Sequence, residues 1–258
     1  MKKKVLIILF FGCFFLLAGC NLKNNQVTID RSKQTRLIKK NQRIWSRRIK
    51  NTHPVSDAMF DKKIIRVPDG YNDEDMSYER LKNGNQLLIK GKVINLQPEN
   101  YRSIGTETKG TVQIEKVISG DESFTGKTIE TEFSGGITQA KDYFTSIEGE
   151  YFGKGYGFSN PKTKVLVTNS VVPMPNIGNT VILGLNKYRP ENKYRQAMYK
   201  KNGLTLKNFY VINNPEVTYW VMRNGQFKLN NPAFYQKKNR NKYPQLFKIT
   251  KKLNKTYL

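Results

Sequence analysis

The chain has 258 residues, of which 45 are lysine or arginine and 20 are aspartate or glutamate, giving a formal net charge of +25. Two cysteines and one histidine exclude a framework of several disulfides and leave too few ligands for ordinary zinc sites. A Ser-His-Asp triad would depend on His53 alone, which precedes a proline in a predicted turn. We therefore expect no metal and no other cofactor. The length suffices for one domain with extensions or for two small domains.

The first residues have the order of a secretory signal. Three lysines at positions 2–4 precede an almost unbroken apolar run over 5–17, which is followed by small residues. The run is shorter than the roughly 20 apolar residues that a membrane-spanning helix needs. The sequence therefore predicts a signal peptide over 1–19 that is removed on export.

The end of the apolar run consists of Leu17, Ala18, Gly19 and Cys20, and it resembles the lipobox of bacterial lipoproteins. The resemblance implies that the thiol of Cys20 receives a diacylglycerol group and that the signal is cut just before this cysteine. The alternative is an ordinary secreted protein with a chance cysteine at its cleavage site. Because two or three acyl chains anchor a protein stably, we expect a lipid-anchored protein on the extracytoplasmic face of the cell membrane.

Export changes the meaning of the positive charge. Without the three signal lysines, 42 basic residues remain against 20 acidic ones. In an intracellular protein this balance would indicate nucleic acid, whereas an exported protein meets anionic lipid headgroups and the phosphates of wall polymers. The abundance of lysine and asparagine is typical of an AT-rich Gram-positive genome. We therefore predict envelope polyanions or a protein partner as ligands, and not nucleic acid.

Residues 20–60 are predicted to form a lipidated basic segment, either a tether or an amphipathic helix. Residues 31–50 contain nine basic residues and no acidic one, with apolar residues at helical spacing. Three arrangements stay open: the helix lies on the anionic outer leaflet, docks on the following domain, or is a flexible tether. In the first arrangement, the membrane contacts would be Arg36, Lys39, Lys40, Arg43, Trp45, Arg47 and Arg48.

Residues 61–234 have the period of two that is typical of β-strands. Short segments rich in β-branched and aromatic residues predict strands over 86–97, 110–120, 127–136, 162–172, 179–188, 208–214, 217–225 and 226–231. Asn224 and Gly225 predict a two-residue hairpin turn. A short helix, with Asp75 as its N-cap and Gly84 as its stop, is expected before the first strand. The predicted fold is mainly β, a small barrel with short flanking helices, and residues 235–258 add a basic C-terminal helix or tail.

Three stretches resemble a pattern found in bacterial exported proteins that have an OB-like barrel: SYERLKNGNQLLIKGKVINLQ, GTVQIEKVISGDESFTGKTIETEFSGG and IGNTVILGL. This family is compared by fold to the tissue inhibitors of metalloproteinases. The matching positions are Gly91, Val93, Val117, Gly120, Gly135, Gly136 and 178–185, with an insertion near 137–162. The resemblance implies a small OB-like β-barrel but does not imply an activity. Protease inhibition is not carried over, because those inhibitors use a free N-terminal cysteine and disulfides that this chain lacks.

Three local features are candidates for chemistry. The glycine-rich stretch 150–162 predicts a loop that stacks on a ligand, unless it is a hairpin tip packed on its own barrel; its candidate residues are Tyr151, Phe152, Lys154, Tyr156 and Phe158. The acidic stretch 69–79 lacks the spacing and central glycine of a calcium loop, so a capped helix start is expected there. Glu148 and Glu150 are expected to be surface charges.

The function predicted from these features is a noncatalytic surface module that binds an envelope polyanion or a protein partner. The alternative is a cell-envelope enzyme that uses lysine, tyrosine or carboxylate groups, with no catalytic residue assigned, and a scaffolding role is the third candidate. Lysine and tyrosine side chains gathered on one open barrel face would favour binding, whereas carboxylates converging in a deep pocket would favour catalysis.

Overall fold

The computed structural model describes residues 31–59, 71–99, 106–146, 148–236, 239 and 241–258. The chain divides into two compact units, residues 1–40 and 41–258. In the first unit, residues 31–40 are described and are helical, and the helix ends at residue 49. The predicted signal peptide and the lipobox with Cys20 lie outside the described residues. Within the described residues, no helix is both long and apolar enough to cross a membrane.

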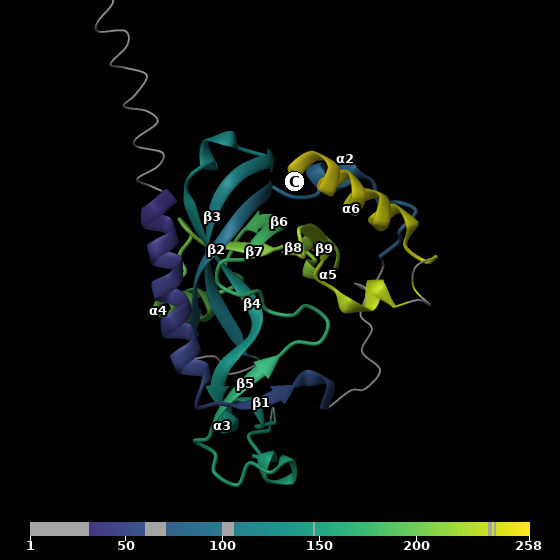
Figure 1. Cartoon of the computed structure of the whole chain (residues 1–258). Helices are drawn as coiled ribbons and strands as arrows, with labels where there is room; N and C mark the ends of the chain where they lie inside the picture. Colours follow the sequence, from purple (N-terminus) through teal and green to yellow (C-terminus); the bar gives the residue numbers. More distant parts are fainter. Residues whose placement is uncertain (1–30, 60–70, 100–105, 147, 237–238, 240) are drawn as a thin grey trace, which may run out of the picture. The chain divides into compact units, whose positions relative to one another are not determined.

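The unit 41–258 is organised around a single sheet, which has nine strands in its described part (Figure 1). The strand order is β1-β5-β4-β3-β2-β6-β8-β9, and β7 pairs with β6 outside this path. The β1–β5 pair is parallel and the other ladders are antiparallel. The strands are β1 (His53–Ser56), β2 (Leu87–Pro98), β3 (Glu107–Ser119), β4 (Thr128–Gln139), β5 (Lys164–Thr168), β6 (Thr180–Lys187), β7 (Tyr210–Ile212), β8 (Tyr219–Arg223) and β9 (Gln226–Leu229). The prediction of a mainly β fold is confirmed.

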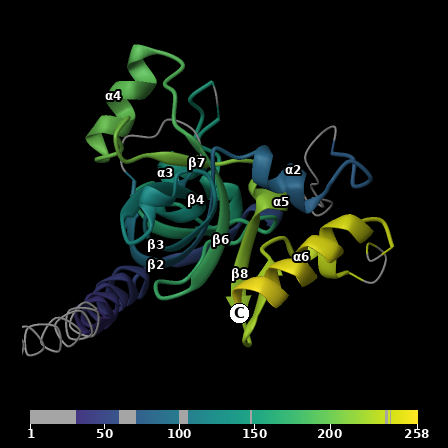
Figure 2. The same ribbon diagram turned by 90° about the horizontal axis from the view of Figure 1, so that it is seen from above.

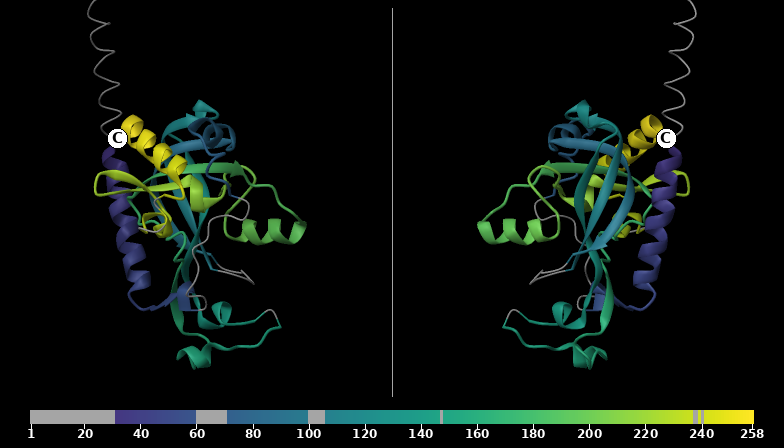
Figure 3. Two further views of the ribbon diagram at one scale, coloured as in Figure 1. Left: turned by 90° about the vertical axis from the view of Figure 1, so that its right-hand side faces the viewer. Right: turned by 90° about the vertical axis from the view of Figure 1, so that its left-hand side faces the viewer.

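Short helices flank this sheet. The α-helices are α2 (Tyr78–Asn83), α3 (Ala140–Tyr143), α4 (Lys193–Lys201), α5 (Pro215–Thr218) and α6 (Pro244–Tyr257). The 3-10 helices are η1 (Asp57–Met59), η2 (Glu122–Phe124), η3 (Gly153–Tyr156) and η4 (Pro232–Tyr235). Helices α4 and α6 lie on opposite sides of the long strands, as Figures 2 and 3 show.

The long strands β2, β3 and β4 are curved, so the sheet curls into a half-barrel (Figure 3). In β3, alternate residues such as Thr108, Val112 and Ile114 are buried, as expected for strands with one face turned to a core. Strand β4 passes from β3 to β5 at Gly135 and Gly136, whose φ angles of +93° and +126° favour glycine. A Cβ atom at Gly136 would lie 1.9 Å from the hydroxyl oxygen of Thr108, so the bend also needs the missing side chain.

A second contact brings the two ends of the curled region together. The backbone N–H of Glu130 in β4 donates to the carbonyl oxygen of Asn208 at 2.8 Å, and Glu130 forms a parallel bridge with Phe209, just before β7. Because β7 pairs with β6 and β6 pairs with β2, the strands β2, β3, β4, β7 and β6 follow one another in a circuit. Its strands contribute buried side chains such as Val112, Ile129 and Phe133 to a core.

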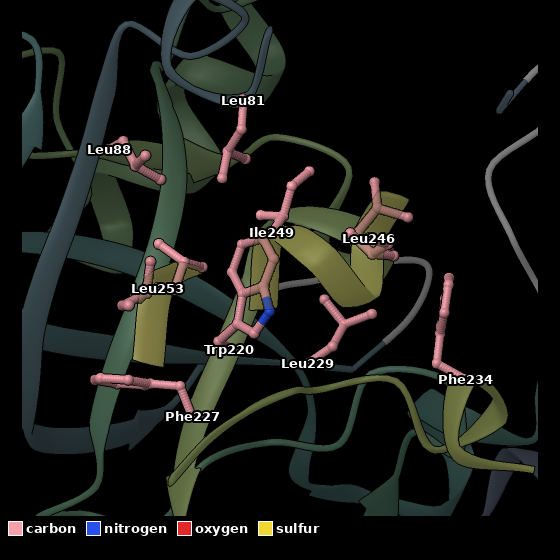
Figure 4. Packing of buried hydrophobic residues seen from close by; sticks show 11 residues of the cluster. Leu81, Leu88, Trp220, Phe227, Leu229, Phe234, Leu246, Ile249 and Leu253 are labelled. Atoms are coloured by element: carbon pink, nitrogen blue, oxygen red, sulfur yellow. The ribbon is translucent and has the colours of Figure 1, made fainter. Parts of the chain in front are cut away.

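Helix α6 covers a second core on the other face of β2, β6 and β8 (Figure 4). Its buried side chains Leu246, Ile249 and Leu253 lie on one face, at the spacing from which the sequence predicts a C-terminal helix. They pack around Trp220, which is fully buried and whose indole N–H donates to the hydroxyl oxygen of Thr250 at 3.0 Å. Burial of an indole with its N–H satisfied is favourable, so α6 is an integral part of this unit.

The beginning of the unit 41–258 is held to the curled sheet by side chains. The amide N–H groups of Asn41 and Gln42 donate to the carbonyl oxygens of Ile94 and Ile177, each at 2.8 Å. Trp45 is only 8% exposed. Residues 41–49 therefore dock on the domain, which is one of the three arrangements that the sequence leaves open for this segment.

Several local expectations need correction. The N-cap of α2 is Ser77 and not Asp75, because the hydroxyl of Ser77 accepts a hydrogen bond from the N–H of Arg80 at 3.0 Å. His53 begins strand β1 rather than lying in a turn, because it is paired with Val165. The predicted strand 217–225 starts as α5 and becomes extended at residue 219. Other expectations hold, since the strand segments are close to those predicted and the hairpin turn between β8 and β9 has positive φ at positions 224 and 225.

Candidate functional site

The predicted aromatic loop does bring its residues together, and they pack on one another. The fully buried ring of Phe144 is at the centre, with the rings of Tyr156 and Phe158 stacked on it at centroid distances of 5.4 and 5.0 Å. Phe152 meets the same ring edge to face at 5.9 Å, and the hydroxyl of Tyr151 donates to the carbonyl oxygen of Phe158. The rings therefore form a small core, which is the hairpin-tip arrangement that the sequence leaves open.

Part of this loop still faces solvent. Phe152 and Tyr156 are 40% and 38% exposed, and Lys154 is exposed beside them. These two rings meet edge to face at a centroid distance of 6.2 Å, so each covers part of the surface of the other. A ligand role for this loop stays a prediction. Glu148 and Glu150 are both exposed, in agreement with their expected place on the surface.

The described part of the acidic stretch, residues 71–79, stabilises the fold. Asp73 is buried, and its carboxylate accepts hydrogen bonds from the N–H groups of Gln245 and Leu246 at 2.8 and 3.2 Å, together with the hydroxyl of Tyr71 at 2.8 Å. It therefore caps the N-terminus of α6, where a negative charge is favourable. Asp75 forms an exposed ion pair with Arg80 at 3.9 Å. Among the described residues, no group of three or more metal-ligating side chains converges.

The basic residues predicted to touch the membrane are largely exposed. Arg43, Arg47 and Arg48 are exposed in the unit 41–258, as are Arg36, Lys39 and Lys40 in the described part of the first unit. Trp45 differs from them because it is buried, so in this conformation its ring is not offered to a lipid headgroup. Contact of the cations with a membrane stays a prediction.

A different group of side chains converges on the face where α2 and α6 meet the edges of β2 and β3. Helix α2 supplies Tyr78 and Lys82, strands β2 and β3 supply one lysine each, and α6 supplies another lysine and a tyrosine. We call this group the Lys–Tyr cluster, and its members are Tyr78, Lys82, Lys90, Lys116, Lys252 and Tyr257.

Two tyrosines form the centre of the cluster. The hydroxyl oxygens of Tyr78 and Tyr257 are 3.0 Å apart and share a hydrogen bond. Burial, reinforced by this hydrogen bond, raises the pKa of Tyr78 far above its ordinary value. The phenol of Tyr78 is therefore neutral at physiological pH and adds no negative charge to the cluster.

The ammonium groups surround this pair. The Nζ atoms of Lys252 and Lys82 lie 4.0 and 5.7 Å from the ring centroid of Tyr78, and Nζ of Lys116 lies 5.2 Å from that of Tyr257. Nζ of Lys90 donates to the main-chain carbonyl oxygen of Tyr257 at 2.8 Å. Cation–π contacts and a carbonyl acceptor hold these lysines in place without neutralising them.

The positive charge of the cluster is poorly compensated. Lys82 pairs with Glu79 at 2.9 Å, but within the described residues no carboxylate forms an ion pair with Lys90, Lys116 or Lys252. Lys90 and Lys116 are directly opposite each other in the β2–β3 ladder, an arrangement that is unfavourable for like charges. Such an arrangement suits an anion that would bridge the two ammonium groups.

Sequence reasoning missed this cluster. Its members come from four elements, of which β3 and α6 are distant in sequence from α2 and β2, and each lysine alone has the pattern of an ordinary solvated residue. Lys90 and Lys116 lie side by side only because of the register in which β2 pairs with β3. Comparisons of the chain with models of known protein families and with curated proteins find no match, so the candidate site is argued from its geometry.

Proposed function

We propose that this protein is a lipid-anchored, noncatalytic module on the extracytoplasmic face of the membrane that binds a phosphate-bearing envelope polyanion. The Lys–Tyr cluster is the observation that carries the proposal. Among the described residues, Lys90, Lys116 and Lys252 have no carboxylate partner, and the hydroxyl groups of the two tyrosines lie beside them as hydrogen-bonding groups for phosphate oxygens. Lys116 and Lys252 are exposed, which suits a polymer that passes over a surface better than a small molecule that needs a pocket.

The strand circuit supports an OB-like barrel as the scaffold of this module. The strands β2, β3, β4, β6 and β7 can be numbered 1 to 5 in chain order. Neighbours around the circuit then follow the order 1-2-3-5-4-1. The bridge next to β7 is parallel, and the ladders are antiparallel. This is the pairing expected of a five-stranded, partly open Greek-key barrel. The Lys–Tyr cluster lies on the α6 side of β2 and β3, so the binding proposal depends on its charges and not on the fold.

The membrane anchor is the second part of the proposal. Stable anchoring requires two membrane-binding features. Here they would be a diacylglyceryl group on Cys20 and the exposed cations between residues 36 and 48. The intact mass of the N-terminal peptide from the membrane fraction tests this part. We expect a lipidated Cys20 at the new terminus, and we expect Cys20→Ala protein to be shed or left uncleaved. An unmodified terminus would overturn the anchor.

Binding is tested by titrating the purified lipidated protein, in uncharged detergent micelles, with long-chain polyphosphate and with neutral dextran. We expect binding to polyphosphate alone, weakening as salt is raised because phosphate contacts release counterions. The double substitution Lys116→Gln and Lys252→Gln should weaken binding about tenfold and lower the salt dependence by about one to two counterions.

A matched control removes the same charge elsewhere. Lys162 and Lys164 are exposed near the start of β5, and their double substitution by glutamine should change the affinity less than twofold. Equal losses in the two double variants would mean that charge is spread over the whole surface, and the Lys–Tyr cluster would not be the site. No binding to polyphosphate by the unsubstituted protein would overturn the proposed function.

A further inference from the structure

A pocket of about 280 Å³ lies between α2, with the loop that precedes it, and α5 (Figure 2). One wall consists of residues from the segment 71–85, and the other consists of residues from the segment 213–218, which follows β7. The side-chain amide of Asn213 joins the two walls, because it donates to the carbonyl oxygen of Gly84 at 3.0 Å and to the side-chain oxygen of Asn85 at 3.1 Å. The protein itself therefore holds the pocket in shape.

Side-chain amides gather in this pocket, whose lining includes Asn72, Asn85, Asn213 and Asn214. Asn85 is only 7% exposed, and its amide N–H donates to the carbonyl oxygen of Leu81 at 2.6 Å. Asn214 is exposed, and its side chain makes no hydrogen bond to any of the described residues. An amide offers N–H donors and a carbonyl acceptor together, so these walls suit a ligand that also carries donors and acceptors side by side.

The backbone of Asn214 supplies a separate argument. Its φ angle is +48°, in the left-handed region that glycine adopts most easily. Residues other than glycine in this region are often retained because the side chain has a function. Since the amide of Asn214 lines a pocket and has no partner within the described part of the chain, its retention there indicates a ligand contact.

The pocket is electrically balanced, whereas the chain as a whole carries a net charge of +25. Among the described residues, its charged lining groups are Asp75 and Arg80, which pair with each other at 3.9 Å. The side chains of Tyr71, Met76 and Val217 add apolar surface. A neutral ligand with one apolar face therefore fits these walls better than an anion does.

We infer that this pocket binds a neutral N-acetylated sugar, as one ring of a glycan. The acetamido group carries one N–H donor and one carbonyl acceptor, so it can exchange two hydrogen bonds with the amide of Asn214, and its methyl group matches the apolar surface of Met76 and Val217. Since a cavity of about 150 Å³ accepts benzene, a volume of about 280 Å³ suits one sugar ring. The inference is independent of polyanion binding, because the pocket and the Lys–Tyr cluster share no residue.

The test is saturation-transfer NMR on the purified lipidated protein, in micelles of an uncharged detergent that contains no sugar. N-Acetylglucosamine and N-acetylgalactosamine are the probes, and glucose is the matched control because it lacks the acetamido group. We expect at least one probe to bind, with the strongest transfer to its acetamido methyl group, and glucose to bind about tenfold more weakly because the acetamido hydrogen bonds are missing. Binding of neither probe, or equal binding of glucose, would overturn the inference.

Asn214→Gly removes the amide without disturbing the fold. Glycine adopts positive φ at least as easily as asparagine, so the melting temperature should be equal or higher, while the affinity for the N-acetylated sugar should fall about tenfold. Asn224→Gly is the matched control, because Asn224 also has a positive φ of +51°, is exposed, and lies in the β8–β9 turn outside the pocket. Unchanged sugar affinity in Asn214→Gly, or an equal loss in Asn224→Gly, would overturn the inference.

Two variants keep this inference apart from the proposed function. The double substitution Lys116→Gln and Lys252→Gln should weaken polyphosphate and leave the sugar affinity unchanged, and Asn214→Gly should do the reverse. Loss of sugar binding in the double variant would place the sugar at the Lys–Tyr cluster and overturn the inference. If the unsubstituted protein does not bind polyphosphate, the proposed function fails, and the sugar titration still decides this inference.

Discussion

Aromatic rings gather at two places in the unit 41–258, and they are used differently. Around Phe144, the rings of one loop stack on one another and close a small core. In the Lys–Tyr cluster, Tyr78 and Tyr257 meet through their hydroxyl groups, and lysines occupy the faces of their rings. The first place is satisfied by its own residues, whereas the second retains positive charge that a ligand could neutralise.

The difference shows what makes an aromatic surface available for binding. Rings that contact each other gain packing energy and lose free surface, so their clustering stabilises the fold. Rings that contact ammonium groups present charge and hydrogen-bond donors together. This contrast would fail if the Phe144 loop were dispensable for stability, or if the Lys–Tyr cluster were dispensable for polyphosphate binding.

Phe144→Ala is expected to have the largest effect. Removing a fully buried phenylalanine lowers the free energy of unfolding by about 3–5 kcal/mol, because a cavity replaces its contacts with Tyr156 and Phe158. Urea denaturation of the purified protein measures this loss. Phe152→Ala is the control, since its ring is 40% exposed, and it should cost about 1 kcal/mol or less.

Equal costs for these two substitutions would contradict the description of the loop as a small core. Where Phe144→Ala leaves the protein folded, its affinity for polyphosphate should match that of the unsubstituted protein. A loss of polyphosphate binding would mean that the exposed part of the loop, with Lys154, takes part in recognition.

Much of the fold could be predicted from the sequence. The strands follow from short alternating segments, and the β8–β9 hairpin follows from Asn224 and Gly225, which adopt positive φ at low cost. Helix α4 escaped prediction because only Tyr199 in it is buried, so it has almost no apolar stripe. The sequence predicts Asp75 as the N-cap of α2 because Asp and Ser are both good caps, and only the backbone geometry at Ser77 distinguishes them.

The candidate site could not be predicted in the same way. The aromatic loop was found because its rings are close in sequence, but closeness in sequence also lets them pack on each other. Lys90 and Lys116 become neighbours only through the β2–β3 register, which contains bulges that no sequence pattern revealed. The position of Lys252 depends on how α6 docks, and α6 is held by its packing around Trp220 and by the carboxylate of Asp73, which is far away in the chain.

Asp73→Ala should have an intermediate effect. The change removes the acceptor for two N–H groups at the start of α6 and for the hydroxyl of Tyr71, and we expect a loss of about 2 kcal/mol in the free energy of unfolding. Because α6 carries Lys252 and Tyr257, polyphosphate binding should weaken too. Thermal denaturation and the polyphosphate titration measure the two effects.

Asp75→Ala is the matched control for Asp73→Ala. Its carboxylate makes an exposed ion pair with Arg80 at 3.9 Å, so the expected cost is about 0.5 kcal/mol or less. If Asp73→Ala destabilised the protein without changing polyphosphate binding, the position of α6 would not matter for the Lys–Tyr cluster. The contrast between the two aromatic regions would then lose its functional meaning.

The smallest expected effect is a pH dependence in the Phe144 region. Burial, followed by the charge of Asp57, raises the pKa of Tyr143 to about 12 from its ordinary value of 10. The folded state therefore favours the neutral phenol, and this contribution is complete below pH 10 and is lost as the pH rises from 10 towards 12. Because Tyr143 is half-buried, solvent screening limits the loss to about 1 kcal/mol. Urea denaturation at pH 8 and pH 11 should show a smaller loss of stability in Tyr143→Phe than in the unsubstituted protein. Equal losses in the two proteins would mean that this ring is not part of the core around Phe144.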